Sequence, residues 1–264
     1  MSLGNYIARL FPLMLAFVIL SNKFNKKYIY FTPIILVLSD TLVFLTGERT
    51  ALGLLLISTV LIILLVSKYK YLRLITFLIS TVSLIFISLF FPFVYERNIN
   101  QTYDQIVINK DEPLELNNLR MFSARHESHF FTALKIFKDN KIIGAGPNSF
   151  RKLCDNKKYY INYFSCSTHP HNSYIQILSE TGIVGLLFLL LPSIYIIYIL
   201  LNHIYNSLFF KIKKLSDYQL CLLICFITTL WPLLPTVNFF NNWINVIYYL
   251  PLGFYLQTIH AKTK

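Results

Sequence analysis

Long apolar runs recur along this chain and leave it few ways to fold. Of its 264 residues, 55% are hydrophobic and only 14% are charged, whereas a soluble domain has about a quarter charged residues. A helix that crosses a bilayer needs about 20 apolar residues, and it satisfies its own backbone hydrogen bonds, as lipid requires. The composition therefore predicts an all-α polytopic membrane protein.

One polar segment separates the fourth apolar run from the fifth. We predict about seven transmembrane helices, at residues 6–21, 28–45, 50–67, 72–91, 173–201, 218–237 and 243–260. The chain then divides into four transmembrane helices at 1–91, one large extracytoplasmic loop at 92–172 and three transmembrane helices at 173–264. Polar chemistry is therefore expected in and around the loop.

Basic residues cluster after the first, third and fifth runs and at the end of the chain. They are Lys23, Lys26, Lys27, Lys68, Lys70, Arg73, Lys211, Lys213, Lys214, Lys262 and Lys264. Short loops rich in Lys and Arg stay in the cytoplasm, so residues 92–172 are predicted to lie outside. Arg9 and Arg49 fall at predicted membrane ends.

A nucleic-acid partner is not needed to explain the net charge of +12. The clustered residues are explained by topology, and the loop at 92–172 keeps a balance of only about +3. Such a surface suits an anionic substrate near the lipid headgroups, although simple contact with membrane lipids explains the charge equally well.

The four cysteines fall into two pairs. Cys154 and Cys166 lie in the predicted outer loop, twelve residues apart, where oxidising conditions permit a disulfide. A disulfide and two free thiols are equally open alternatives for this pair. Cys221 and Cys225 lie at helical spacing inside a predicted span and are interpreted as packing residues.

The outer loop contains one strong helical pattern, at residues 124–140. Its apolar residues gather on one side and its charges on the other, which predicts an amphipathic helix on the membrane surface or against the bundle. The Gly144–Asn148 cluster that follows predicts a turn. No strand precedes its Gly-x-Gly, so a nucleotide-binding loop is not expected.

The turn at 46–50 carries two charges between two apolar helices on the outer side. Arg49 is a candidate for binding a lipid phosphate, with an ion pair to Glu48 or headgroup anchoring as the alternatives. Asp40 lies within the preceding span, where an acid is usually paired inside the bundle. We therefore expect Asp40 to have a structural role.

Two histidines precede the fifth span. A helix that starts at Pro170 would place His171 at its positive end, which disfavours the charged imidazolium. A neutral imidazole can accept a proton, so His171 is a candidate general base. A capping or interfacial histidine is the structural alternative. His126 and His129 add no spacing typical of a metal site, so no metal and no cofactor are expected.

Three blocks of sequence carry a family resemblance. LTGERTALGLLL at 45–56, ARHESHFFTALKIFKDNKIIGAGPNSF at 124–150 and HPHNSYIQILSETGIVGLLFLL at 169–190 resemble the bacterial O-antigen ligase family. The last block has the family's His-Asn, nine residues, Gly, two residues, Gly. The resemblance implies a catalytic His171 and substrate-binding Arg49 and Arg125, with Arg120 as a nearby alternative to Arg125. His169 and Asn172 are further candidates for binding substrate.

The resemblance also implies an activity and a place. Members of this family transfer a glycan from undecaprenyl pyrophosphate to a lipid A–core acceptor at the periplasmic face of the inner membrane, during lipopolysaccharide biosynthesis. The expected enzyme is a metal-independent, inverting glycosyltransferase. An O-antigen polymerase, with a glycan acceptor, or a protein O-oligosaccharyltransferase of the same fold is the nearest alternative.

Two further hypotheses belong to other classes. A lipid-linked sugar transporter would need no base, but such folds usually show inverted repeats, which this sequence lacks. A non-catalytic fragment is the second alternative, because the family normally has about twelve spans. Seven spans with an outside start predict the C-terminal part of a longer protein or a truncated relative.

Overall fold

The computed structural model describes residues 3–21, 28–104 and 122–260, and every regular element among them is helical. The helices fall into two compact units. Unit 1 comprises Met1–Asn98, Tyr195–Trp231 and Val246–Lys264, and unit 2 comprises Ile99–Ile194 and Pro232–Asn245. The predicted all-α fold is confirmed. The predicted division of the chain at residues 91 and 172 separates membrane segments from a loop, whereas the two units are defined by compactness. That predicted division stays a prediction.

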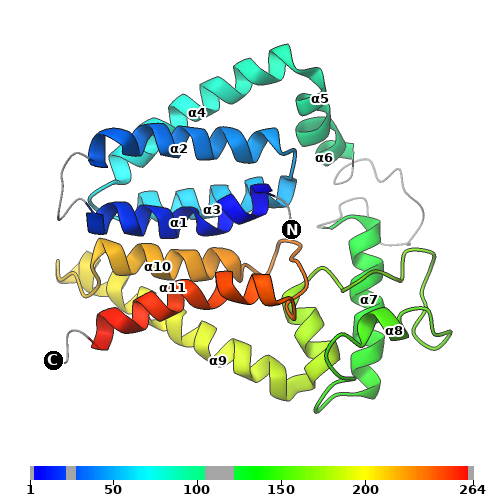
Figure 1. Cartoon of the computed structure of the whole chain (residues 1–264). Coiled ribbons are helices and arrows are strands. Elements are labelled where there is room, and N and C mark those ends of the chain that lie inside the picture. Colours follow the sequence, from blue (N-terminus) through cyan, green and yellow to red (C-terminus); the bar gives the residue numbers. More distant parts are fainter. Residues whose placement is uncertain (1–2, 22–27, 105–121, 261–264) are drawn as a thin grey trace. The chain divides into compact units, whose positions relative to one another are not determined.

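Unit 1 is a bundle of apolar helices (Figure 1). Helix α1 packs against α3 and α10, and α2 packs against α4. The bounds are α1 Leu3–Ser21, α2 Tyr28–Leu45, α3 Arg49–Leu65, α4 Lys70–Phe90, α10 Asp217–Thr229 and α11 Asn242–His260, with the last part of α9, Ser173–Phe209. The basic clusters at 23–27 and 262–264 lie outside the described residues.

The helices have the lengths and surfaces of a membrane protein. Leu3–Ser21, Lys70–Phe90 and Ser173–Phe209 are long and apolar enough to cross a bilayer, and Tyr30–Leu45, Arg49–Leu65 and Asp217–Thr229 are shorter apolar helices. Large apolar side chains such as Val82 and Leu89 are exposed on α4, as expected for a surface that faces lipid. The count of seven spans stays a prediction.

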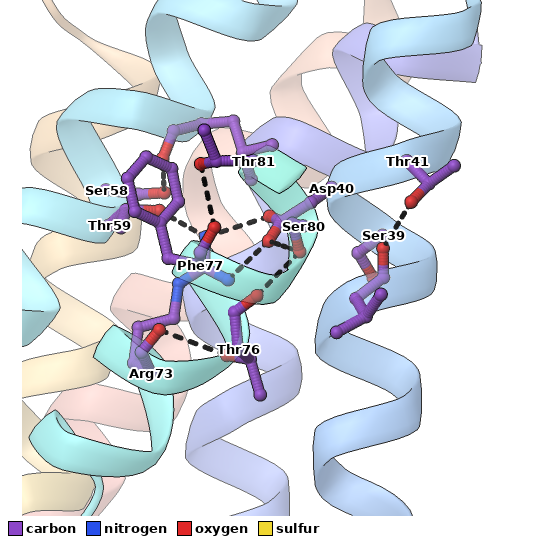
Figure 2. A network of polar contacts seen from close by, with 12 residues as sticks. Ser39, Asp40, Thr41, Ser58, Thr59, Arg73, Thr76, Phe77, Ser80 and Thr81 are labelled. Carbon is purple, nitrogen blue, oxygen red and sulfur yellow. Dashed lines mark hydrogen bonds and ion pairs between the residues drawn. The ribbon is translucent and has the colours of Figure 1, made fainter. Parts of the chain in front are cut away.

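A buried ion pair joins α2 to α4 (Figure 2). The Arg73 guanidinium donates from both terminal nitrogens to the Asp40 carboxylate, at 2.7 and 2.8 Å, and also to Thr59. Ser80 donates to the same carboxylate. The expected pairing of Asp40 is confirmed, but the prediction of Arg73 as a cytoplasmic loop residue is wrong. The ring of Phe11, 4.5 Å from the guanidinium carbon, completes a dry site for the charge.

Arg9 is a second correction. It lies in the first half of α1, fully buried, and its Nη1 donates to the Thr229 carbonyl at 2.6 Å. The residue is therefore a bundle residue and not an anchor at a membrane end. The α10 helix ends at Thr229, so its free carbonyl supplies the acceptor that the guanidinium needs.

Unit 2 contains the amphipathic helix expected at 124–140, observed as α7, Ala124–Asp139. Ser123 caps it, since the backbone N–H of His126 donates to the Ser123 hydroxyl. A small core lies beneath α7 and the short α8, Phe150–Leu153. It consists of Ala133, Ile136, Phe150, Cys154 and Tyr159. The short helices α5 Pro92–Tyr95, η1 Glu96–Asn100 and α6 Gln101–Tyr103 connect the two units in sequence.

Two glycines allow the 141–146 turn to lie against α9. Gly182 has a φ of +68° and interrupts the helix, and a Cβ there would collide with the carbonyl of Ile142. Gly144, with a φ of +70°, would collide in the same way with the backbone of Glu180. Backbone bonds from Ala145 to Ser179 and from Ile183 to Lys141 hold this contact. Only glycine permits both the conformation and the approach.

Candidate functional site

Four histidines that are far apart in the sequence gather in unit 2. The His171 ring centroid lies 4.1 Å from that of His169, 5.2 Å from that of His126 and 5.3 Å from that of His129. His126 and His129 come from the first half of α7, and the other two from the segment before α9. Each pair could be seen in the sequence, but the sequence did not predict that the two pairs meet.

His171 lies outside the helix that follows it. Helix α9 begins at Ser173, so the prediction that a helix starts at Pro170 is wrong. His171 has a φ of +60°, and its carbonyl accepts a hydrogen bond of 2.7 Å from the Thr236 N–H. Its Nε2 lies 3.0 Å from the Ser167 hydroxyl. The left-handed backbone, rather than a helix end, therefore directs the imidazole.

Asn172 explains why α9 begins where it does. Its side-chain oxygen accepts hydrogen bonds from the N–H groups of Tyr174 and Ile175, at 3.0 and 3.1 Å, which is the geometry of a helix cap. Its amide nitrogen donates to the Pro232 carbonyl at 3.0 Å. Both ends of the amide are thus used within the protein, an arrangement that suits holding His171 in place.

His169 is more deeply buried than His171. Its Nε2 lies 3.2 Å from the Thr236 carbonyl, and its Nδ1 lies 2.9 Å from the Thr168 hydroxyl. Thr236 therefore contacts the histidine segment twice, through its carbonyl at His169 and its N–H at His171. This pairing fixes the two rings relative to each other.

Burial lowers the pKa of three histidines of the cluster. It lowers the pKa of His129 to about 4 and that of His169 to about 4, and in both the neighbouring His171 adds repulsion. The pKa of His171 is also lowered, first by burial and then by the charge of Arg125. The neutral state expected from a helix dipole thus has a different physical cause: loss of solvent and a nearby cation.

Arg125 lies at the start of α7, exposed, with its guanidinium carbon 5.3 Å from the centre of the Phe164 ring. Phe164 belongs to a loop closed by a disulfide between Cys154 and Cys166. Asn162 in that loop donates to the Ser128 hydroxyl on α7 at 2.9 Å. The loop is thereby tied to the helix that carries Arg125. The alternative residue, Arg120, lies outside the described residues.

One group in the described part of the chain has potential metal ligands close together. The Cys154 and Cys166 sulfurs and a carboxylate oxygen of Asp155 lie within 4.8 Å of one another. The disulfide leaves neither sulfur as a thiolate, and the thiolate is the form that binds metal. This group therefore does not fit a resident metal ion.

Arg49 belongs to unit 1, at the first residue of α3. The preceding turn is held by Arg97, whose Nε donates to the Gly47 carbonyl at 3.1 Å. Glu48 accepts a hydrogen bond of 2.7 Å from Asn5. Arg49 and Arg97 thus lie near each other at this turn. The sequence suggested only Arg49 as a phosphate-binding residue.

A polar network beside the cluster was not predicted. The buried carboxylate of Glu180 accepts from the backbone N–H groups of Asn148 and Phe150, both at 3.0 Å. Gln176, also buried, donates to Glu180 and to Asn238. The Gly-rich turn at 144–148 was a signal for a special backbone, but its partners on α9 are visible only in the fold.

A known family matches one continuous stretch of the sequence, which belongs partly to unit 1 and partly to unit 2. A model of the O-antigen ligase family matches residues 34–190, which is more than half of the chain. The chain belongs to the O-antigen ligase family. The match includes Arg49, Arg125 and His171, and no curated protein and no solved structure matches the chain. The family is one of membrane glycosyltransferases of the ligase or polymerase type.

Proposed function

We propose that this protein transfers a glycan from undecaprenyl pyrophosphate to a lipid A–core acceptor, as an O-antigen ligase. The observation that carries the proposal is the histidine cluster, in which burial and the charge of Arg125 lower the pKa of His171, within one compact unit. A glycosyl transfer of this kind needs a base for the acceptor and positive charge for the leaving group, and these side chains supply both. Membership of the family and the apolar helices agree with it.

In the proposed reaction His171 is the general base. An unprotonated imidazole nitrogen takes the proton of the acceptor hydroxyl as its oxygen attacks the anomeric carbon of the donor. The bond from that carbon to the phosphate oxygen breaks, and its electron pair leaves with the pyrophosphate. A single displacement of this kind inverts the anomeric centre. No metal or other cofactor takes part in these steps.

The arginines have the second role. Arg49 and Arg125 bind the pyrophosphate, because a guanidinium offers a planar pair of donors that matches phosphate oxygens. Stacking on Phe164 restricts Arg125 before substrate arrives, which lowers the entropic cost of binding. His169 and Asn172, which were expected to contact substrate, are proposed instead to position His171 through Thr236 and the start of α9.

The proposed location is the inner membrane, with the site on the periplasmic side. The disulfide in the histidine unit supports this, because disulfides persist in oxidising compartments. An O-antigen polymerase or a protein O-oligosaccharyltransferase would use the same donor chemistry and a different acceptor. Assays with purified lipid A–core, with a repeat-unit glycan and with a peptide acceptor separate these three activities.

The direct test replaces His171. His171→Ala is expected to reduce transfer from an undecaprenyl-pyrophosphate-linked glycan by roughly a hundredfold or more, the usual contribution of a general base. The exposed His260→Ala, on α11, is the matched control and should retain wild-type transfer. Equal rates for both variants at equal abundance in the membrane would overturn the general-base proposal.

A further inference from the structure

A second arginine follows a residue that contacts the histidine cluster of unit 2: the ring centroid of Phe150, the residue before Arg151, lies 6.4 Å from that of His129. Arg151 is in α8, directly after the 144–149 turn, and its side chain is exposed. Its Nη2 donates to the side-chain oxygen of Asn148 at 2.9 Å. Within the described part of the chain it has no ion-pair partner. One end of the guanidinium is therefore anchored at Asn148, and its charge also lies within electrostatic range of the buried Glu180 carboxylate.

The anchor is itself fixed by a chain of hydrogen bonds. Asn148 has a left-handed backbone, with a φ of +60°, and its side-chain oxygen also accepts from Asn238 at 3.3 Å. The side-chain oxygen of Asn238 in turn accepts a hydrogen bond of 2.7 Å from the buried Gln176 of α9. Strained backbone held by such surroundings is typical of functional sites. The hydrogen bonds thus run from the buried Gln176 to the exposed guanidinium of Arg151.

The charge of Arg151 reaches the site. Burial is the main cause of the lowered pKa of His169, and the charge of Arg151 adds a smaller part. Burial likewise comes first for His171 and His129, and the charge of Arg125 adds to it. The two adjacent histidines therefore each have an arginine within electrostatic range. A donor with two linked phosphates needs more than one cationic contact, since its charges are close together.

We propose that Arg151 binds a phosphate group of the lipid-linked donor and that Asn148 positions it. The inference rests on the proposed glycosyl transfer and adds a third arginine to the two that the sequence suggested. Arg151 is a substrate-binding residue in this scheme. Asn148 acts only through Arg151, and Glu180 holds the backbone of the turn that carries them.

The test measures the KM for an undecaprenyl-pyrophosphate-linked glycan with the purified full chain in nanodiscs. Arg151→Gln is expected to raise the KM about tenfold to a hundredfold, the loss of one charge-assisted hydrogen bond. Arg151→Lys should recover part of this loss. Lys152→Gln removes the same charge from the next exposed residue of α8 and should leave the KM within twofold of wild type.

Asn148→Gly tests the positioning role without backbone strain, because glycine accepts the left-handed backbone and removes the side chain that anchors Arg151 and accepts from Asn238. It is expected to raise the KM less than Arg151→Gln, with little change in kcat. Equal KM values for Arg151→Gln and Lys152→Gln would overturn the inference. Binding of undecaprenyl pyrophosphate, measured without turnover, gives the same comparison if His171→Ala shows that the transfer proposal is wrong.

Discussion

At the scale of single residues, His171 combines an uncommon backbone with a half-buried ring whose pKa is lowered. A φ of +60° is seen in only a few per cent of residues other than glycine. Two interactions hold it there: the Thr236 N–H donates to the His171 carbonyl, and the next residue, Asn172, caps α9. The fold thus stabilises a conformation that the residue alone would rarely adopt, as is common where a side chain must be aimed.

The lowered histidine pKa values predict a pH-dependent stability. Unfolded histidine has a pKa near 6.5, while His129 and His169 have values of about 4 in the folded protein. Between these values the unfolded chain binds protons that the folded chain does not. Stability should therefore be greatest above about pH 6.5 and fall as the pH drops toward 4.

Thermal unfolding in detergent between pH 7.5 and 4.5 measures this effect. His129→Gln should flatten the decline of the midpoint, whereas His260→Gln, at an exposed position, should leave the slope as in wild type. Parallel curves for wild type and His129→Gln would show that burial of His129 does not penalise its protonation.

At the scale of helices, α9 depends on its interruption at Gly182. Gly182→Ala would force a Cβ into the Ile142 carbonyl at a φ of +68°, so the turn at 141–146 must separate from the helix. We expect a loss of stability of about 1–3 kcal/mol or more, together with loss of transfer. Differential scanning fluorimetry and the transfer assay report the two effects.

Gly253→Ala is the matched control in α11. A Cβ there meets nothing within 4 Å, and alanine favours a helix over glycine by about 1 kcal/mol. This variant should unfold at the wild-type temperature or slightly above it. If the Gly182→Ala protein unfolded at the same temperature as the Gly253→Ala protein, the steric account of the interruption would be contradicted.

At the scale of the whole molecule, the distribution of charge predicts the topology. Lys68, Lys70 and Lys211–Lys214 lie at helix ends that the positive-inside rule places in the cytoplasm. Helix α7 and the histidine cluster then lie on the outer side. Part of the predicted outer loop, residues 105–121, falls outside the described residues, so an exposed residue of α7 is the better probe.

An impermeant thiol reagent tests this arrangement in intact spheroplasts. Lys138→Cys on α7 should be labelled, and Lys213→Cys should be labelled only after the membrane is opened. The native Cys221 and Cys225 are buried and should not react. Labelling of Lys213→Cys alone in intact cells would reverse the proposed orientation.

The sequence by itself determined the features that depend on local pattern. The apolar runs predicted the helices, the amphipathic period predicted α7 to within a residue at its end, and the isolated acid at Asp40 predicted a buried partner. The spacing of His171, Gly182 and Gly185 indicated the family that the family model later matched. Each of these signals is contained in a short stretch of chain, where backbone geometry and hydrophobicity act directly.

Only the tertiary structure decided which distant residues meet. It placed Arg73 on Asp40, joined His126 and His129 to His169 and His171, and linked Arg151 through Asn148 to the interior. It also showed that α9 begins at Ser173, where Asn172 caps the helix and donates to the distant Pro232 carbonyl. Such choices depend on partners far along the chain, and the burial that lowers the histidine pKa values exists only once those partners have packed together.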